Sequence, residues 1–193
     1  MHPWPATVVL ALAPEEAQAL LTTIVQPTPE VEGARAVLGL SHSEACLALI
    51  AIYDGAVAAP PWQVCYPEGS RILQLASNES SKRPDPGELV MVYQAHPAWS
   101  RAHLESDRWP VELLAEATRF CGAWAATPSR TEPHRWRFAR SDRSAELAGP
   151  MLLRLPGGAR LGLAGDRFAP RGGVEAAFAS GRRLAARILP GAQ

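Results

Sequence analysis

Apolar and polar positions at the start of the chain predict a strand followed by a helix. Thr7–Leu12 is a short apolar run rich in β-branched residues and is followed by Pro14, so we expect a buried strand. Pro14 suits the first turn of a helix, and Glu15 and Glu16 favour its positive end. The apolar stripe of this helix comprises Ala17, Leu20, Leu21 and Ile24.

The middle of the chain is rich in short apolar runs that Pro, Gly, Asn and Ser clusters separate. Ser43–Tyr53 is compatible with a strand or a helix, and its length and β-branched end favour a strand. The three runs that follow predict an antiparallel meander and comprise Trp62–Tyr66, Arg71–Ala76 and Glu88–His96. Pro97–Ala125 predicts a short turn and then a longer helix from Trp109. The predicted inner face of that longer helix comprises Val111, Leu114, Ala117 and Thr118.

The last third of the chain predicts strands followed by a helix. The predicted strands are His134–Ala139, Met151–Leu155 and Arg160–Ala164. Gly172–Ile188 predicts the helix, whose apolar side comprises Val174, Ala177, Phe178, Gly181, Leu184, Ala185 and Ile188. The whole pattern predicts an α+β fold whose two ends return to one α/β layer.

Composition and charge narrow the class of protein. The 193 residues are 47% hydrophobic and 20% charged with zero net charge, which argues for a folded chain and against a dedicated nucleic-acid binder. Residues 130–193 carry twelve Arg and five acids, so this third of the chain suits an anionic partner such as a phosphate, or is a set of solvated faces. No apolar run reaches the roughly 18–20 residues needed to cross a bilayer. Three cysteines without a C-x-x-C pair suit free thiols in a reducing cytoplasm, where we expect this protein.

One stretch, Arg160–Ile188, carries candidate chemistry. The predicted strand ends in Gly165 and Asp166, and a carboxylate at that edge is well placed for ligand hydroxyl groups. Gly172 and Gly173 permit close backbone approach, and the helix that follows offers free N–H groups to an anionic oxygen. An ordinary strand, loop and helix capped by Asp166 is the alternative.

Several segments together resemble one family. GLAGDRFAPRGGVEAAFASGRRLAARI resembles the carboxyl-terminal flavin-binding signature of the FAD-dependent amine oxidase superfamily, and most of all the renalase-like NAD(P)/FAD-dependent oxidoreductases of bacteria. In chain order, TVVLALAPEEAQALL, SNESSKRPDPGE, VYQAHPAWSRAHLE and EPHRWRFARS resemble further segments of that family. Two details depart from its pattern: His96 and Trp99 are closely spaced, and Phe138 replaces a tyrosine.

A larger departure concerns the dinucleotide-binding segment. The family begins with a G-x-G-x-x-G strand, turn and helix, which this sequence lacks. The resemblance therefore implies partial FAD-binding, Rossmann-like pieces at residues 1–40 and 146–193, around an antiparallel substrate-binding domain at residues 41–145. It also implies that the chain lacks the start of the family's fold, and that an FAD-binding partner polypeptide or a homodimer completes it.

The resemblance also implies roles for particular residues. Gly165 and Asp166 lie at the FAD ribitol or pyrophosphate edge, and Gly173, Val174 and Glu175 form the helix end that faces the flavin. In the loop, Arg167 stands where the family has an aromatic residue, and Phe168 is a candidate to replace its packing.

The remaining candidates are aromatic residues and histidines. Trp99 and Trp136 suit the walls of a pocket for a flat or cationic amine, or alternatively core packing. His96 and His134 have no further ligands at fixed spacing, so we expect no metal site.

Three functions remain open from the sequence. The first is an oxidoreductase that transfers hydride from an amine or a dihydronicotinamide, NAD(P)H, to FAD. The second is a non-catalytic binding or scaffold protein whose apolar face meets a partner, and the third is a flavoenzyme remnant that no longer binds FAD.

Overall fold

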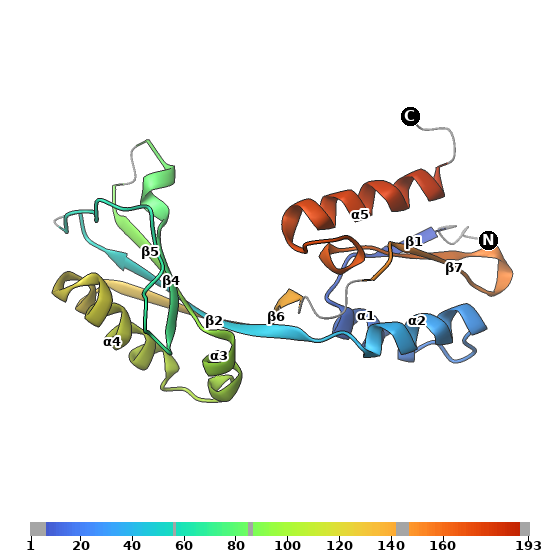
Figure 1. The fold of residues 1–193 in the computed structure, drawn as a ribbon, viewed down its shortest axis with the longest axis horizontal. Helices are drawn as coiled ribbons and strands as arrows, with labels where there is room; N and C mark the ends of the chain where they lie inside the picture. The colour runs from blue at the N-terminus through green and yellow to red at the C-terminus, as the bar shows by residue number, and fades with distance from the viewer. Residues whose placement is uncertain (1–6, 56, 85–86, 142–146, 190–193) are drawn as a thin grey trace. The chain divides into compact units, whose positions relative to one another are not determined.

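The computed structural model describes residues 7–55, 57–84, 87–141 and 147–189, which form an α+β fold with five α-helices (Figure 1). The chain divides into two compact units. Unit 1 comprises residues 1–43 and 140–193, so the two ends of the chain belong together, and unit 2 comprises residues 44–139.

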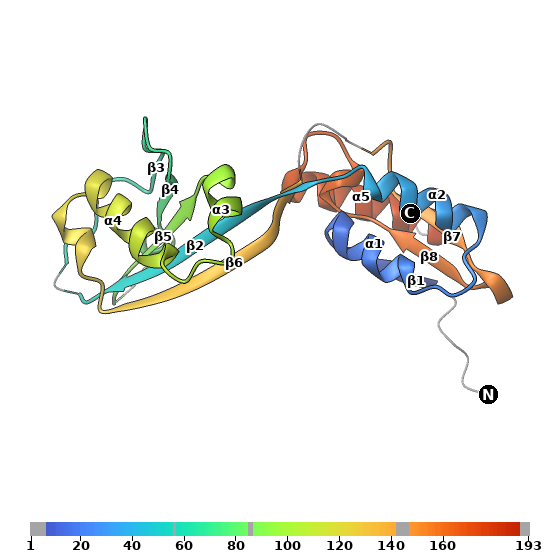
Figure 2. The ribbon, with the colours of Figure 1, turned by 90° about the horizontal axis from the view of Figure 1, so that it is seen from below.

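Unit 1 is built on a three-stranded sheet in the order β1-β8-β7. Its elements are β1 (Thr7–Leu10), α1 (Pro14–Thr22), α2 (Pro29–Gly39), β7 (Met151–Arg154), β8 (Arg160–Leu163) and α5 (Gly173–Ile188), with short 3-10 turns η4 (Pro156–Gly158) and η5 (Asp166–Phe168). Strand β1 pairs in parallel with β8, and β7 pairs with β8 antiparallel. Helices α1 and α2 cover one face of the sheet and α5 covers the other (Figures 1 and 2). The strands and helices predicted at both ends of the chain are thus confirmed. The two ends also meet in one sheet, because β1 pairs with β8.

Helix α2 has no counterpart in the sequence prediction. Its first turn is capped by Thr28, whose Oγ1 accepts a hydrogen bond from Val31 N at 3.3 Å. Glycines within and at the end of the helix weaken the helical signal of the sequence. The helix forms because its buried side chains, Val31, Ala34 and Leu38, join Phe168 in the core of unit 1.

The buried face of α5 differs from the predicted apolar face. Val174 and Phe178 are exposed, and the buried positions are Ala176, Ser180 and Leu184. The helix lies so close to β8 that a Cβ atom on Gly162 would come within 2.8 Å of the Leu184 side chain. Such close packing selects small residues for much of the buried face, so hydrophobicity predicted Leu184 correctly but not Val174 and Phe178.

Unit 2 contains a five-stranded sheet in the order β3-β4-β5-β2-β6. Its elements are β2 (Ser43–Tyr53), β3 (Val64–Cys65), β4 (Leu73–Asn78), η1 (Glu79–Lys82), β5 (Leu89–Ala95), α3 (Pro97–His103), α4 (Trp109–Cys121), η2 (Ala123–Ala126) and β6 (Arg130–Ser141). Strands β3, β4, β5 and β2 pair antiparallel, which confirms the predicted antiparallel sheet.

The buried face of α4 agrees with the prediction at Ala117 and differs from it elsewhere. Trp109, Leu113 and Ala117 face the sheet, whereas Val111 is exposed and Leu114 is only partly buried. Trp109 begins the helix and follows the helical spacing of Leu113 and Ala117, so its large ring fixes which side of α4 points inward.

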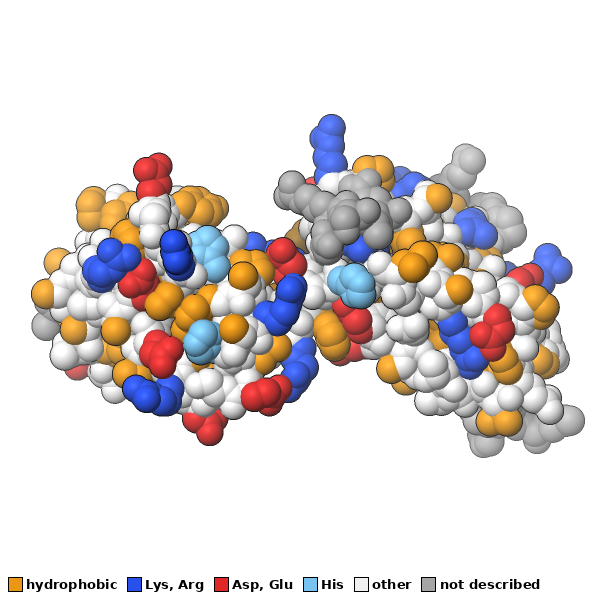
Figure 3. Space-filling view, turned by 60° about the horizontal axis from the view of Figure 1, so that its bottom comes forward, with side chains coloured by type: hydrophobic (Ala, Val, Ile, Leu, Met, Phe, Trp, Pro, Cys, Tyr) orange, Lys and Arg blue, Asp and Glu red, His pale blue; other side chains and the backbone are white. Residues whose placement is uncertain are grey.

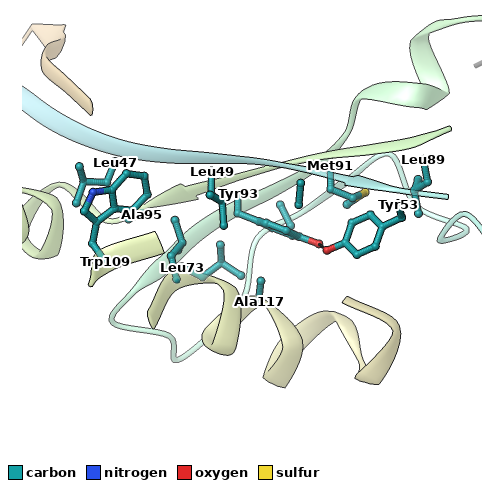
Figure 4. Packing of buried hydrophobic residues seen from close by; sticks show 13 residues of the cluster. Leu47, Leu49, Tyr53, Leu73, Leu89, Met91, Tyr93, Ala95, Trp109 and Ala117 are labelled. Atoms are coloured by element: carbon teal, nitrogen blue, oxygen red, sulfur yellow. Dashed lines mark hydrogen bonds between the residues drawn. The ribbon is translucent and has the colours of Figure 1, made fainter. Parts of the chain in front are cut away.

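The core of unit 2 includes a buried pair of tyrosines (Figure 4). The hydroxyl groups of Tyr53 and Tyr93 lie 3.0 Å apart, and Tyr53 also donates to the Ala125 carbonyl at 2.9 Å. Burial raises the pKa of both hydroxyl groups. Burial and, secondarily, Cys65 raise the pKa of the Cys121 thiol to about 11. These groups therefore stay protonated at neutral pH and serve packing.

Candidate functional site

The candidate site lies where two parallel strands of unit 1 end together. Leu10 of β1 is opposite Leu163 of β8, and Ala164 N donates to the Leu10 carbonyl at 3.2 Å. Gly165 and Asp166 follow directly at this edge. Gly165 has a φ of 153°, a backbone conformation that residues with a side chain rarely adopt. The strand therefore turns at this glycine and presents Asp166 at the carboxyl edge of the sheet, where ligands bind in open α/β sheets.

Ser180 of α5 fixes the turn at Gly165. Its Oγ accepts from Gly165 N at 2.9 Å and lies 2.7 Å from the Gly165 carbonyl and 2.9 Å from the Ala177 carbonyl. The side chain is fully buried. Ser180 thus ties the end of β8 to α5. It was not singled out by the sequence analysis, and the signal that it offered was a polar side chain among the alanines of the helix.

Asp166 is half-buried and is held by a neighbour from another part of unit 1. Its Oδ1 accepts from Ser141 Oγ, the last residue of β6, at 2.9 Å. The carboxylate therefore does not extend freely into solvent, and Ser141 restricts its orientation. This partner was not predicted, because the two residues are distant in sequence.

The start of α5 provides free backbone donors beside this edge. Gly172 occupies the N-cap position with no side-chain cap, and Gly172 and Gly173 have φ values of 62° and 81°. The N–H groups of the first turn, including those of Val174 and Glu175, have no acceptor within the helix. Both of these side chains are exposed. This end of α5 suits an acceptor with negative charge.

A hollow of about 460 Å³ lies beside the first turns of α5. It is lined by Ala169, Pro170, Arg171, Gly172, Glu175, Ala176, Ala179 and Arg183. The hollow includes Glu175 of the predicted site but neither Gly165 nor Asp166. Arg183 donates to the Phe168 carbonyl at 3.1 Å, so one of its two arginines also holds the loop.

The two loop residues after Asp166 point into unit 1. Phe168 is buried in the core of the unit. Arg167 is only 3% exposed, its Nε lies 3.4 Å from Ser41 Oγ, and its Nη2 has no hydrogen-bond partner among the described residues. Both side chains therefore anchor the loop, and neither forms an exposed aromatic surface at the strand edge.

The two tryptophans predicted for a substrate pocket are not brought together. Trp99 of α3 stacks on His103 with ring centroids 4.1 Å apart and packs against the core of unit 2. On β6, Arg135 and Arg137 bind Asp107 and Glu105 of the segment between α3 and α4. Side chains alternate along a strand, so Trp136 lies on the opposite face of the sheet, 51% exposed. Trp136 is thus an exposed ring on β6, whereas Trp99 is partly buried against the core of unit 2.

Other chemistry is limited in the part of the chain that the structure describes. No cluster of three or more His, Cys, Asp or Glu side chains suits a metal ion there. None of the helices in these residues is both apolar and long enough to cross a bilayer. Figure 3 shows acidic and basic side chains interspersed with hydrophobic ones on the visible face of each unit.

Comparison with known proteins gives a likeness in fold. No protein-family model matches the sequence, and no curated protein matches it significantly. A putrescine oxidase with bound putrescine matches with a TM-score of 0.64 and 17% identity, over 94% of this chain and 42% of that one. Cyclohexylamine oxidase from Brevibacterium oxydans matches with a TM-score of 0.58 and 14% identity, over 93% of this chain and 42% of that one.

An oxidoreductase from Methanosarcina mazei matches as well, with a TM-score of 0.60 and 15% identity, over 94% of this chain and 42% of that one. The chain therefore has the fold of part of these oxidases and spans about two fifths of their length.

Proposed function

We propose that this chain supplies the carboxyl-terminal flavin contacts and the substrate domain of an FAD-dependent oxidoreductase of the renalase-like amine oxidase type. The observation that carries the proposal is the shared edge of β1 and β8, where Gly165, Asp166 and the uncapped start of α5 adjoin. Support also comes from the fold, because 94% of the chain matches oxidases that act on amines by name.

The residues at this edge fit FAD in chemical type. Asp166, oriented by Ser141, accepts hydrogen bonds from the ribityl hydroxyl groups or the adjoining ribose. Gly165 keeps the backbone turned so that this carboxylate reaches the ligand. The N–H groups of Gly173, Val174 and Glu175 stabilise negative charge at the pyrimidine end of the ring. Ser180 preorganises both parts by linking Gly165 to α5.

Bound FAD supplies the chemistry, which is acceptance of hydride from an amine or from NAD(P)H. The protein contributes binding and orientation. On unit 2, the exposed ring of Trp136 offers an aromatic surface to a flat or cationic small-molecule substrate. We further propose that an FAD-binding partner polypeptide with a G-x-G-x-x-G segment holds the rest of the cofactor.

FAD titration followed by flavin fluorescence tests the proposal. It is run on the purified chain and on the chain co-expressed with a polypeptide that carries G-x-G-x-x-G, which is sought first among the neighbouring reading frames. We expect saturable binding and a yellow complex, and Asp166→Ala should weaken FAD binding about tenfold or more, since a charged hydrogen bond is lost. Asp54→Ala, a change to an exposed aspartate of unit 2, is the matched control and should leave binding within about twofold.

Absence of FAD binding by both the chain and the complex would overturn the proposal. A stable but colourless complex would favour the scaffold function instead. Equal FAD affinity of wild type and Asp166→Ala would remove Asp166 from the site.

A further inference from the structure

Cys65 lies in a row of side chains that crosses the sheet of unit 2 on the side of α4. It is opposite Ala76 of β4, and Ala76 is opposite Tyr93 of β5. Directly opposed residues of antiparallel strands project to the same face of a sheet. Ala76 and Tyr93 are fully buried in the core that the sheet shares with α4, so Cys65 also faces this helix.

Cys121 approaches the same region from the helix. The inward side of α4 carries Trp109, Leu113 and Ala117, which follow one another at helical spacing. Cys121 is the last residue of the helix and continues this spacing, and it packs partly buried against the core that Cys65 also contacts. The two thiols therefore lie on the two sides of one interface, between the sheet and the end of α4.

The electrostatic interactions of these groups agree with this placement. Burial is the main cause of the raised pKa values of Cys121, Tyr53 and Tyr93. Cys65 adds to the raised pKa of Cys121, and Cys121 adds to that of each tyrosine. Such an influence acts between near neighbours, because the interaction of two charges weakens with their distance. The two thiols thus belong to one cluster with the tyrosine pair.

The surroundings of Cys65 give it access to small solutes. It lies on β3, the first strand in the order β3-β4-β5-β2-β6, and is itself only partly buried. Its chain neighbours Val64 and Tyr66 are 43% and 72% exposed. Cys65 is therefore the thiol of the pair that a small oxidant in solution reaches first, and Cys121 is the thiol beside it.

We propose that Cys65 and Cys121 are a redox-responsive pair that forms a disulfide within unit 2 and joins the edge strand β3 to the end of α4. Both thiols are free in the structure, which therefore describes the reduced state of the pair. Strand β3 comprises two residues and pairs with β4 alone, so it can approach α4 at the cost of few hydrogen bonds. The inference is independent of the proposed function, because it involves neither FAD nor unit 1.

The oxidant is a peroxide, and the reaction balances with hydrogen peroxide. The Cys65 thiolate attacks one peroxide oxygen, the O–O bond breaks, and a sulfenic acid and hydroxide result. The Cys121 thiolate then attacks the sulfur of this sulfenic acid, an S–S bond forms, and a second hydroxide leaves. Each hydroxide takes up the proton that one thiol released, so the pair loses two electrons and the peroxide becomes two water molecules. Because the pKa of Cys121 is about 11, its thiolate is scarce at neutral pH and the second step limits the rate.

Treatment of the purified full chain with hydrogen peroxide, followed by alkylation and mass spectrometry of the unreduced peptides, tests the pair. We expect a linkage between Cys65 and Cys121 in the wild type, which dithiothreitol reverses. In Cys121→Ala, Cys65 should accumulate as sulfenic or sulfinic acid, about tenfold above wild type, because the second thiol is missing. Cys46→Ala is the matched control, because Cys46 is buried on the face of β2 opposite to the core residue Leu47, and it should change the yield of the linkage by less than about twofold.

Hydrogen exchange provides a second measurement. Oxidation should slow exchange in β3 and at the end of α4 in the wild type, and not in Cys65→Ala treated in the same way. The inference is overturned if the folded wild type forms no linkage, forms it only in urea, pairs either thiol with Cys46, or joins two chains. Equal accumulation of oxidised Cys65 in wild type and Cys121→Ala would also overturn it. Circular dichroism verifies that each variant is folded, and the wild type alone decides whether the linkage forms.

Discussion

The sheets of the two units differ in the residues that their edge strands β6 and β1 carry. In unit 2, the long edge strand β6 carries Pro133, Arg135 and Arg137, and both arginines bind acidic residues near α4. In unit 1, the edge strand β1 carries only Thr, Val and Leu. Charged side chains and prolines discourage pairing with another strand, whereas bare apolar edges permit it.

The cores differ in a related way. Large buried side chains fill unit 2, where Trp109, Tyr53 and Tyr93 lie between the sheet and α4 (Figure 4). The core of unit 1 consists mainly of Ala, Leu and Val, and the apolar residues Val174 and Phe178 of α5 remain outside it. The antiparallel sheet of unit 2 thus encloses its large apolar side chains, while unit 1 keeps two of those of α5 at its surface. Variants that act on one unit at a time test this difference.

The largest loss of stability is expected from Trp109→Ala. This side chain is fully buried in unit 2, and its Nε1 has no hydrogen-bond partner, so truncation removes packing and leaves a cavity. We expect a loss of about 3–5 kcal/mol in the free energy of unfolding of unit 2. Urea unfolding monitored by tryptophan fluorescence measures it, because five of the six tryptophans of the chain lie between residues 44 and 139.

Trp136→Ala is the control for that substitution. Its ring is half-exposed on β6, so the same change should cost less than about 1 kcal/mol. Equal losses for the two variants would contradict a core centred on Trp109. Loss of amide protection in α5 with Trp109→Ala would show that the two units do not unfold separately.

A smaller loss of stability is expected when either of two buried serines, one in each unit, is replaced by alanine. Ser180→Ala leaves Gly165 N without its partner, and Ser100→Ala does the same to Leu47 N, which donates to Ser100 Oγ at 3.0 Å. Each change should cost about 1–3 kcal/mol, because a buried N–H is left unpaired. Hydrogen exchange should accelerate in β8 and α5 for the first variant, and in β2 and α3 for the second. If either variant accelerated hydrogen exchange in both units, the two units would not unfold independently.

Ser180 also shows where sequence reasoning reaches its limit. The order of strand, glycine, aspartate and helix was sufficient to predict the strand edge at Gly165 and Asp166, because each signal is local. The partners Ser180 and Ser141 are not local, since their roles depend on how α5 and β6 approach the loop. A polar residue among the alanines of a helix marks an unusual position, but it does not identify the partner that tertiary packing supplies.

Tertiary packing also explains why the buried faces of two helices were only partly predicted and why one helix was not predicted. Apolar periodicity located α4 and α5, but Trp109 and the close approach at Gly162 decide which sides are buried. The glycines of α2 lower its helix propensity, so this helix was not predicted, although its buried side chains stabilise it. Trp99 and Trp136 suggested one pocket by residue type alone, whereas Trp99 packs against the core of unit 2 and Trp136 is half-exposed on β6.

The smallest effect concerns the pH dependence of unit 2. Arg119 holds the pKa of the Glu116 carboxyl below its usual range by a hydrogen bond, and the Ser70 hydroxyl adds to the effect. Ser70 Oγ also accepts from Leu73 N at 2.9 Å, so Glu116 connects α4 to the start of β4. A lowered folded-state pKa means that this contribution is present above the unfolded-state pKa and is lost as the pH falls through the folded-state value.

We therefore expect Glu116→Gln to destabilise unit 2 by less than about 1 kcal/mol at neutral pH and to leave its stability unchanged under acid conditions. Urea unfolding at a series of pH values below neutrality measures this, with Glu68→Gln, a change to an exposed carboxylate of the same unit, as the control. The slope of stability against pH should decrease for Glu116→Gln and not for Glu68→Gln. An unchanged slope for Glu116→Gln would mean that the link between α4 and β4 is independent of the charge on Glu116.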